Sequence, residues 1–183
     1  MNWYEKLSRY FPVEEMKSKE HMELLLDEKE VYHKEEGTNY VMMYAEFPTF
    51  IFVDYLFVSK DARGQGLGKR LLDKLKQKEK PIILEVEPAS HQDIDTQKRQ
   101  RFYQREGFHQ ATSIEYKRRS LATGQINELE ILYWAPHHES EEEIYNAMKK
   151  MYREIHTYKD VEVYGDSYQE VDEVLSFEKQ ENN

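Results

Sequence analysis

Three glycines alternate in the hexapeptide Arg63-Gly64-Gln65-Gly66-Leu67-Gly68, and this spacing is where the sequence points most directly to chemistry. The hexapeptide follows an apolar stretch and opens a run with helical periodicity. Glycine lets a backbone curl with its N–H groups turned inward, and a helix start adds unpaired donors and the positive end of a dipole. The loop therefore predicts a site for an anion that carries phosphate.

Two common nucleotide-binding loops do not fit this spacing. A Walker loop requires a glycine in the place of Arg63 and a hydroxyl residue in the place of Arg70. A dinucleotide fingerprint has the spacing Gly-x-Gly-x-x-Gly, whereas Gly64, Gly66 and Gly68 are spaced two and two. The pattern that remains is Arg/Gln-x-x-Gly-x-Gly/Ala.

A single carboxylate, Asp54, interrupts the otherwise apolar run Phe50–Val58, which we expect to be a central strand. Burial of a carboxylate is costly unless it is paired, solvated through a cleft or required for function. Alternation along a strand predicts that Asp54 shares a face with Leu56 and Val58. The sequence leaves open whether this carboxylate acts in chemistry or forms a structural ion pair.

Apolar periodicity and turn residues predict the elements that position these groups. In chain order they are short helices within Trp3–Asp27, strands at Val31–Lys34, Tyr40–Phe47 and Phe50–Val58, a helix from the glycine loop, a strand at Ile82–Glu87, a helix at Asp93–Glu106, strands at Ile114–Arg118 and Glu128–Trp134, a helix at Ser140–Ile155 and a short helix near Gln169–Leu175. This order predicts an α/β (α+β) fold with a mixed central sheet flanked by helices and a C-terminal helical extension.

With these elements in place, the sequence resembles the GNAT superfamily of acetyltransferases. FVDYLFV, before the loop, is similar to the family's central strand, and RFYQREGF, about forty residues on, is similar to its second motif. ILEVEP lies where the family places a further strand. The resemblance implies an acyl-CoA N-acyltransferase domain over residues 1–136, best supported over 40–134, and a helical extension over 137–183 that packs on the domain or on a partner.

The resemblance also implies acetyl-CoA as co-substrate, with no metal. Its pyrophosphate would lie on the loop's N–H groups, and Lys69 and Arg70 would either add charge or be solvated. The pantetheine arm would pair with the strand at residues 56–58, which in the family is splayed from its neighbour. A main-chain N–H there would polarise the thioester carbonyl. The implied cofactor residues are Leu56, Phe57, Val58, Arg63, Gly64, Gln65, Gly66, Leu67, Gly68, Lys69 and Arg70.

Transfer to an amine requires two proton steps. Tyr103 lies four residues before Gly107, where the family often places its general acid, and a tyrosine of pKa about 10 stays protonated at neutral pH. The alternative is that its ring only packs against the cofactor. Asp54 lies where many relatives carry a glutamate that serves as base, sometimes through water. The alternative role for Asp54 is the structural ion pair.

The composition argues against other classes of function. The 183 residues contain no cysteine, which excludes a thiolate zinc site and a cysteine nucleophile. The net charge of −10 argues against a nucleic-acid binder, and no apolar run reaches the roughly 20 residues that span a membrane. A cytoplasmic setting is expected.

The leading hypothesis is an acetyl-CoA-dependent N-acetyltransferase. Its acceptor would be the primary amine of a small molecule or peptide, which attacks the thioester directly. The alternative is a non-catalytic acyl-CoA binding or sensing protein of the same fold. The apolar stripe of the helix at Ser140–Ile155 must be buried, which leaves a homodimer open.

Overall fold

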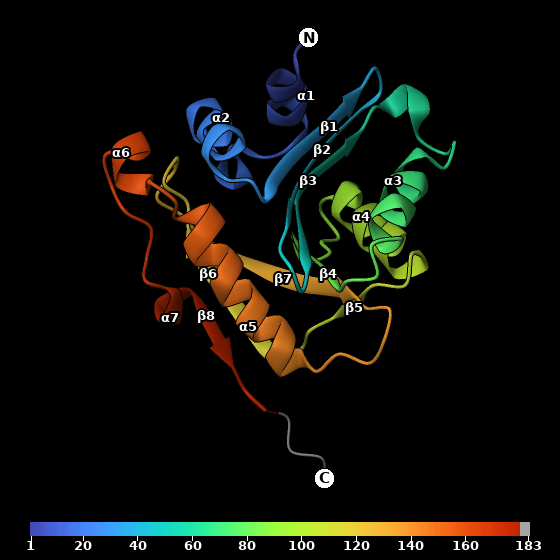
Figure 1. Ribbon diagram of the computed structural model, residues 1–183. Helices are drawn as coiled ribbons and strands as arrows, with labels where there is room; N and C mark the ends of the chain where they lie inside the picture. The colour runs from blue at the N-terminus through green and yellow to red at the C-terminus, as the bar shows by residue number, and fades with distance from the viewer. Residues whose placement is uncertain (180–183) are drawn as a thin grey trace.

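The computed structural model describes residues 1–179 and is built around an eight-stranded sheet (Figure 1). The strands are β1 (Tyr32–Gly37), β2 (Tyr40–Glu46), β3 (Ile51–Val58), β4 (Ile82–Val86), β5 (His109–Gln110), β6 (Ile114–Arg119), β7 (Ile126–Trp134) and β8 (Leu175–Phe177). Their order is β1-β2-β3-β4-β7-β6-β8, and β5 pairs with β7. Among the described strands, β3 and β4 pair in parallel and the other pairs are antiparallel. The predicted mixed sheet is confirmed.

Helices cover both faces of the sheet (Figure 1). They are α1 (Trp3–Tyr10), α2 (Lys19–Glu28), α3 (Leu67–Lys76), α4 (Ile94–Arg105), α5 (Glu141–Met151), α6 (Asp160–Tyr164) and α7 (Val171–Val174), with short turns η1 (Val13–Glu15), η2 (Lys60–Ala62) and the π-helical η3 (Tyr152–His156). No helix in residues 1–179 combines the length and apolar character needed to cross a membrane.

Two buried clusters lie on opposite faces of the sheet. On the face covered by α3 and α4, Leu72 of α3 packs with Val53 and Leu84. On the face covered by α1, α2 and α5, Met148 of α5 packs with Phe52. Because burying one such side chain contributes about 2 kcal/mol, these two layers hold the helices on the sheet.

A bulge interrupts β3 at Asp54. Met43 of β2 pairs with Tyr55 and the next residue, Tyr44, pairs with Val53, so Asp54 has no partner in that strand. A bulge puts two successive side chains on one face. The prediction that Asp54 shares a face with Leu56 and Val58 is therefore wrong. Those two pack with the cluster under α3, whereas Asp54 binds Lys17 and Tyr32 on the opposite face.

The parallel strands β3 and β4 separate after a short contact. They pair at three positions, the last of which joins Val53 to Leu84. From Asp54 to Val58, β3 has no paired register with β4 among the residues that the structure describes. The expected splay of these strands is thus observed, and one edge of β3 is left without a neighbouring strand.

Residues that follow the expected boundary at 136 pack against the rest of the chain. α5 begins after Ser140, whose side chain accepts a hydrogen bond from the Glu143 N–H, and buries its apolar stripe in the core. β8 then adds to the sheet beside β6. The division into residues 1–136 and 137–183 stays a prediction, and residues 180–183 lie outside the described part.

Candidate functional site

A cavity of about 400 Å³ lies between the end of β3, the glycine loop and α4. Eight of the eleven predicted cofactor residues line it: Leu56, Val58, Arg63, Gly64, Gly66, Leu67, Gly68 and Lys69. The side chains of the other three are used elsewhere. Phe57 packs beside Tyr10, the Gln65 amide donates to the Asp61 carbonyl, and Arg70 donates to the Gln65 carbonyl.

The glycine loop needs glycine for two different physical reasons. Gly64 and Gly66 have φ of 81° and 76°, the left-handed region that side chains disfavour. Gly68 lies inside α3, and a Cβ there would come within 3.0 Å of the Phe102 ring of α4. The loop therefore curls at two glycines and packs closely against α4 at the third.

Positive charge predominates around this cavity. The cationic lining residues are Arg63, Lys69, Lys98, Arg99 and Arg105, and the acidic ones are Asp95 and Glu106. The start of α3, at Leu67, adds N–H groups that have no partner within the helix. A loop, a helix start and an excess of cations suit a ligand with several phosphates.

A second, much smaller cavity of about 30 Å³ opens where β3 and β4 separate. It is lined by residues 53–56 of β3, residues 84–87 at β4, and Phe11, Glu15, Arg99 and Tyr103. Leu56, Arg99 and Tyr103 line both cavities. These three side chains thus form a shared wall at which a ligand in the large cavity meets the small one.

Tyr103 holds a central place in that shared wall. Its side chain is 6% exposed, and its ring contacts Phe102 and Phe108. Burial raises the pKa of Tyr103, an effect that the nearby Arg99 opposes and Tyr10 reinforces. The hydroxyl is therefore protonated at neutral pH and can act as a proton donor.

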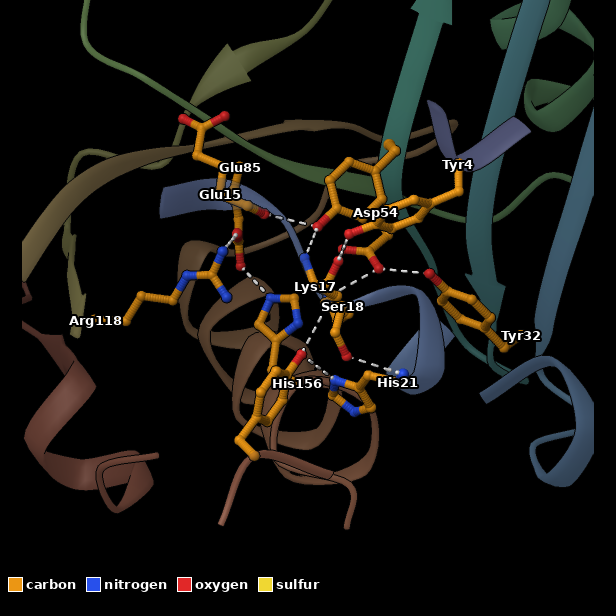
Figure 2. A network of polar contacts seen from close by, with 12 residues as sticks. Tyr4, Glu15, Lys17, Ser18, His21, Tyr32, Asp54, Glu85, Arg118 and His156 are labelled. Atoms are coloured by element: carbon orange, nitrogen blue, oxygen red, sulfur yellow. Dashed lines mark hydrogen bonds and ion pairs between the residues drawn. The ribbon is translucent and has the colours of Figure 1, made fainter. Parts of the chain in front are cut away.

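Asp54 forms a buried ion pair with Lys17 (Figure 2). Each of its carboxylate oxygens lies 2.9 Å from the Lys17 ammonium nitrogen, and the Tyr32 hydroxyl donates to Oδ2 at 2.6 Å. Burial alone would raise the pKa of Asp54, but Lys17, His156 and Tyr32 lower it below its usual value. Of the two predicted alternatives, this arrangement matches the structural ion pair.

The carboxylate of Glu85 in β4 is also bound by basic side chains (Figure 2). Its Oε1 lies 2.8 Å from His156 Nε2, and its Oε2 lies 3.8 Å from Arg118. Burial would raise the pKa of Glu85, yet His156 and Arg118 lower it to about 2. This carboxylate is thus also occupied by cationic or donor partners.

Glu15 is a site residue that the sequence patterns did not reveal. It ends η1, lines the small cavity and is partly buried. Burial first, and then the neighbouring Glu87 carboxyl, raise the pKa of Glu15 to about 8, against opposing effects from Arg99 and Arg118. No spacing rule marks this residue, because it follows a proline break and precedes the best-matched region.

Comparison with known proteins identifies the family. The family model described as Acetyltransferase (GNAT) domain matches residues 24–110. YjbC of Bacillus subtilis (strain 168), a predicted acetyltransferase, is 64% identical over 186 residues, an alignment that covers 100% of this chain and 97% of YjbC. The chain belongs to the GNAT acetyltransferase family. It is thus an acyltransferase, as the sequence motifs predicted.

One solved structure supports a GNAT fold over most of this chain. A predicted acetyltransferase of the GNAT family from Bacteroides thetaiotaomicron has a TM-score of 0.60 and 25% identity, with 89% of this chain and 90% of that chain covered. An aminoglycoside 6'-N-acetyltransferase complexed with coenzyme A has a TM-score of 0.49 and 14% identity; 74% of this chain and 91% of that chain are covered.

The GNAT family match covers the glycine loop and Tyr103 but not the N-terminal residues of the small cavity. Residues 24–110 include β3, the glycine loop and Tyr103. Glu15 and Lys17 lie before the matched region, in the segment between α1 and α2. Hence the matched region supplies the lining of the large cavity apart from Tyr10, whereas Phe11 and Glu15 of the small cavity come from the N-terminal segment outside the match.

Proposed function

We propose that this GNAT protein transfers the acetyl group of acetyl-CoA to a primary amine, which attacks the thioester directly. The observation that carries the proposal is the wall of Leu56, Arg99 and Tyr103 shared by the two cavities. A cofactor in the large cavity would bring its thioester to that wall. An amine in the small cavity would reach it from the other side.

The cofactor would use both features of the large cavity. Its pyrophosphate would lie on the N–H groups from Arg63 to Lys69, with the surrounding cations balancing its charge. Its pantetheine arm would pair with the free edge of β3 at residues 56–58, because β4 has already diverged there. The N–H of Phe57 or Val58 would polarise the thioester carbonyl as an oxyanion donor.

Tyr103 is the proposed general acid. As the C–S bond breaks, its hydroxyl would donate a proton to the departing CoA thiolate. Its raised pKa supports this role by keeping the proton in place until the thiolate forms. Asp54, already paired with Lys17, enters the proposal as a positioning residue and not as the base.

The acceptor is an amine of a small molecule or of a peptide, the two classes that the GNAT family acetylates. The small cavity, at about 30 Å³, has room for a single ammonium group, because a water-sized occupant needs about 10–15 Å³ on this scale. The rest of the acceptor would then remain outside it. An unbranched primary amine suits this space better than a secondary one.

A panel of small amines and peptides, assayed for release of the CoA thiol, tests the function. We expect turnover with at least one primary amine and a kcat/KM that falls when that amine is N-methylated. Calorimetric titration with CoA checks the donor side separately. Tight CoA binding without thiol release from any acceptor would instead favour the sensing alternative.

A further inference from the structure

The small cavity brings four carboxyl groups near the point of transfer, and only some of them are free to accept a proton. Both oxygens of Asp54 are bound by Lys17, and one also accepts from Tyr32. Glu85 is bound by His156 and Arg118. Those two carboxylates are stabilised in their charged form and are therefore weak bases.

Glu15 has different surroundings. Glu15 and Glu87, the residue after β4, both line the small cavity, and burial together with the Glu87 carboxyl raises the pKa of Glu15. No lysine, arginine or histidine forms an ion pair with Glu15 among residues 1–179. A carboxyl beside a like charge holds its proton to higher pH, which makes it a stronger base once ionised.

The backbone at Glu15 is fixed from β3. The Tyr55 hydroxyl donates to the Glu15 carbonyl at 2.7 Å and accepts from the Lys17 N–H at 2.9 Å. Asp54, the bulge residue next to Tyr55, binds the Lys17 side chain. The bulge therefore aims two successive residues of β3 at the same N-terminal segment and holds Glu15 at the small cavity.

We propose that Glu15 is the general base, which takes a proton from the acceptor's ammonium group in the small cavity between the ends of β3 and β4. This inference rests on the proposed function. Glu87 is a positioning residue that raises the pKa of Glu15, and the charged groups facing Glu15 are Glu87 just after β4, Arg99 from α4 and Arg118 from β6.

The protons balance in this scheme. Ionised Glu15 takes one proton from the ammonium group, and the neutral amine nitrogen then bonds to the thioester carbon. The C–S bond breaks, Tyr103 donates its proton to the thiolate, and the second amine proton returns to the Tyr103 oxygen. Glu15 finally releases its proton to solvent, so that the products are an amide, the CoA thiol and one proton.

Glu15→Gln keeps the shape of the side chain and removes its basicity, so we expect kcat/KM to fall by about 100-fold. CoA affinity should stay unchanged. Glu87→Gln removes the neighbouring negative charge, which should shift the acidic limb of the kcat/KM profile to lower pH and raise activity at pH 6–7. Glu14→Gln, in the same turn but outside the small cavity, is the matched control and should match the wild type.

A readout independent of turnover is the ¹³C titration of glutamate carboxyls in the free protein. We expect one carboxyl to titrate near pH 8, to be missing in Glu15→Gln and to move lower in Glu87→Gln. An unchanged profile for Glu15→Gln, in an enzyme that does acetylate an amine, overturns the role of Glu15 alone. A wild type that acetylates no amine overturns the proposed function, and the role of Glu15 with it, even where the titration is as expected.

Discussion

The ammonium nitrogen of Lys17 lies 2.9 Å from each carboxylate oxygen of Asp54, in a pair whose side chains are 2% and 4% exposed. The pair joins the N-terminal segment to the bulge in β3. Since Glu15 is two residues from Lys17, this contact also bears on the geometry of the small cavity. If Glu15 is the base, as proposed, this one ion pair links stability to catalysis.

Removal of one partner should be strongly destabilising. We expect Lys17→Met to lower the free energy of unfolding by about 3–5 kcal/mol, because it leaves the Asp54 charge buried and unpaired. The double variant Lys17→Met with Asp54→Leu should be more stable than Lys17→Met alone. Urea denaturation of the wild type, Lys17→Met, Asp54→Leu and the double variant completes the cycle, with exposed Lys19→Met as the control. Equal losses in Lys17→Met and Lys19→Met would contradict a buried pair.

Cofactor binding should depend on Gly66 for backbone reasons. Gly66→Ala places an alanine at φ 76°, which costs about 1–2 kcal/mol in backbone strain. This strain should shift the N–H groups of the loop and weaken CoA binding roughly 10-fold. Gly124, with φ 74° and open space around its Cβ, lies outside both cavities. Gly124→Ala should therefore carry similar strain with unchanged CoA affinity, as measured by calorimetry. Parallel losses in both variants would show that global strain, and not the loop, lowers affinity.

Local chemistry explains why so much of the large cavity could be predicted from the sequence. The strand, the glycine loop and the helix after it are contiguous in the sequence. The spacing of Arg63 to Gly68 alone therefore predicts a phosphate-binding loop. The second motif added Tyr103. The separation of β3 from β4 was predicted from the family resemblance alone. No residue pattern within either strand indicates it.

The small cavity could not be predicted because its contacts are distant in sequence. Lys17 and Asp54 are 37 positions apart, and nothing in either segment specifies the other. The bulge at Asp54 has no glycine or proline to mark it, so a regular strand put Asp54 on the wrong face. β5 and β8, two and three residues long, depend on pairing partners and were missed for the same reason.

Stability at acidic pH should depend on His156. This side chain is 1% exposed, and burial and Lys17 lower its pKa to about 4, although Glu85 opposes the effect. It is thus neutral in the fold and donates from Nε2 to Glu85. A histidine of ordinary pKa about 6.5 binds a proton first in the unfolded chain, so its contribution falls as pH drops from 6.5 toward 4.

Between pH 6.5 and pH 4, His156 should lower the free energy of unfolding by about 1.4 kcal/mol for each unit by which the pH falls. In His156→Gln, whose amide can still donate to Glu85, the free energy of unfolding should vary less steeply with pH by about that amount. Urea denaturation at pH 7.5, 6.0 and 5.0 measures the difference. Exposed His137→Gln serves as the control and should keep the wild-type slope. Matching slopes in His156→Gln and the wild type would mean that His156 is already charged in the fold.

Tyr103 lies in the wall shared by the two cavities and is the proposed general acid. In Tyr103→Phe the ring and its contacts with Phe102 and Phe108 remain, so CoA should bind with unchanged affinity. The thiolate then leaves without its donor, and kcat should fall by about 100-fold. The loss should be smaller for an acyl donor with a more acidic thiol, because that leaving group needs less protonation. Comparison of kcat for acetyl-CoA and such a donor in wild type and variant measures this, and an equal loss with both would make Tyr103 a packing residue.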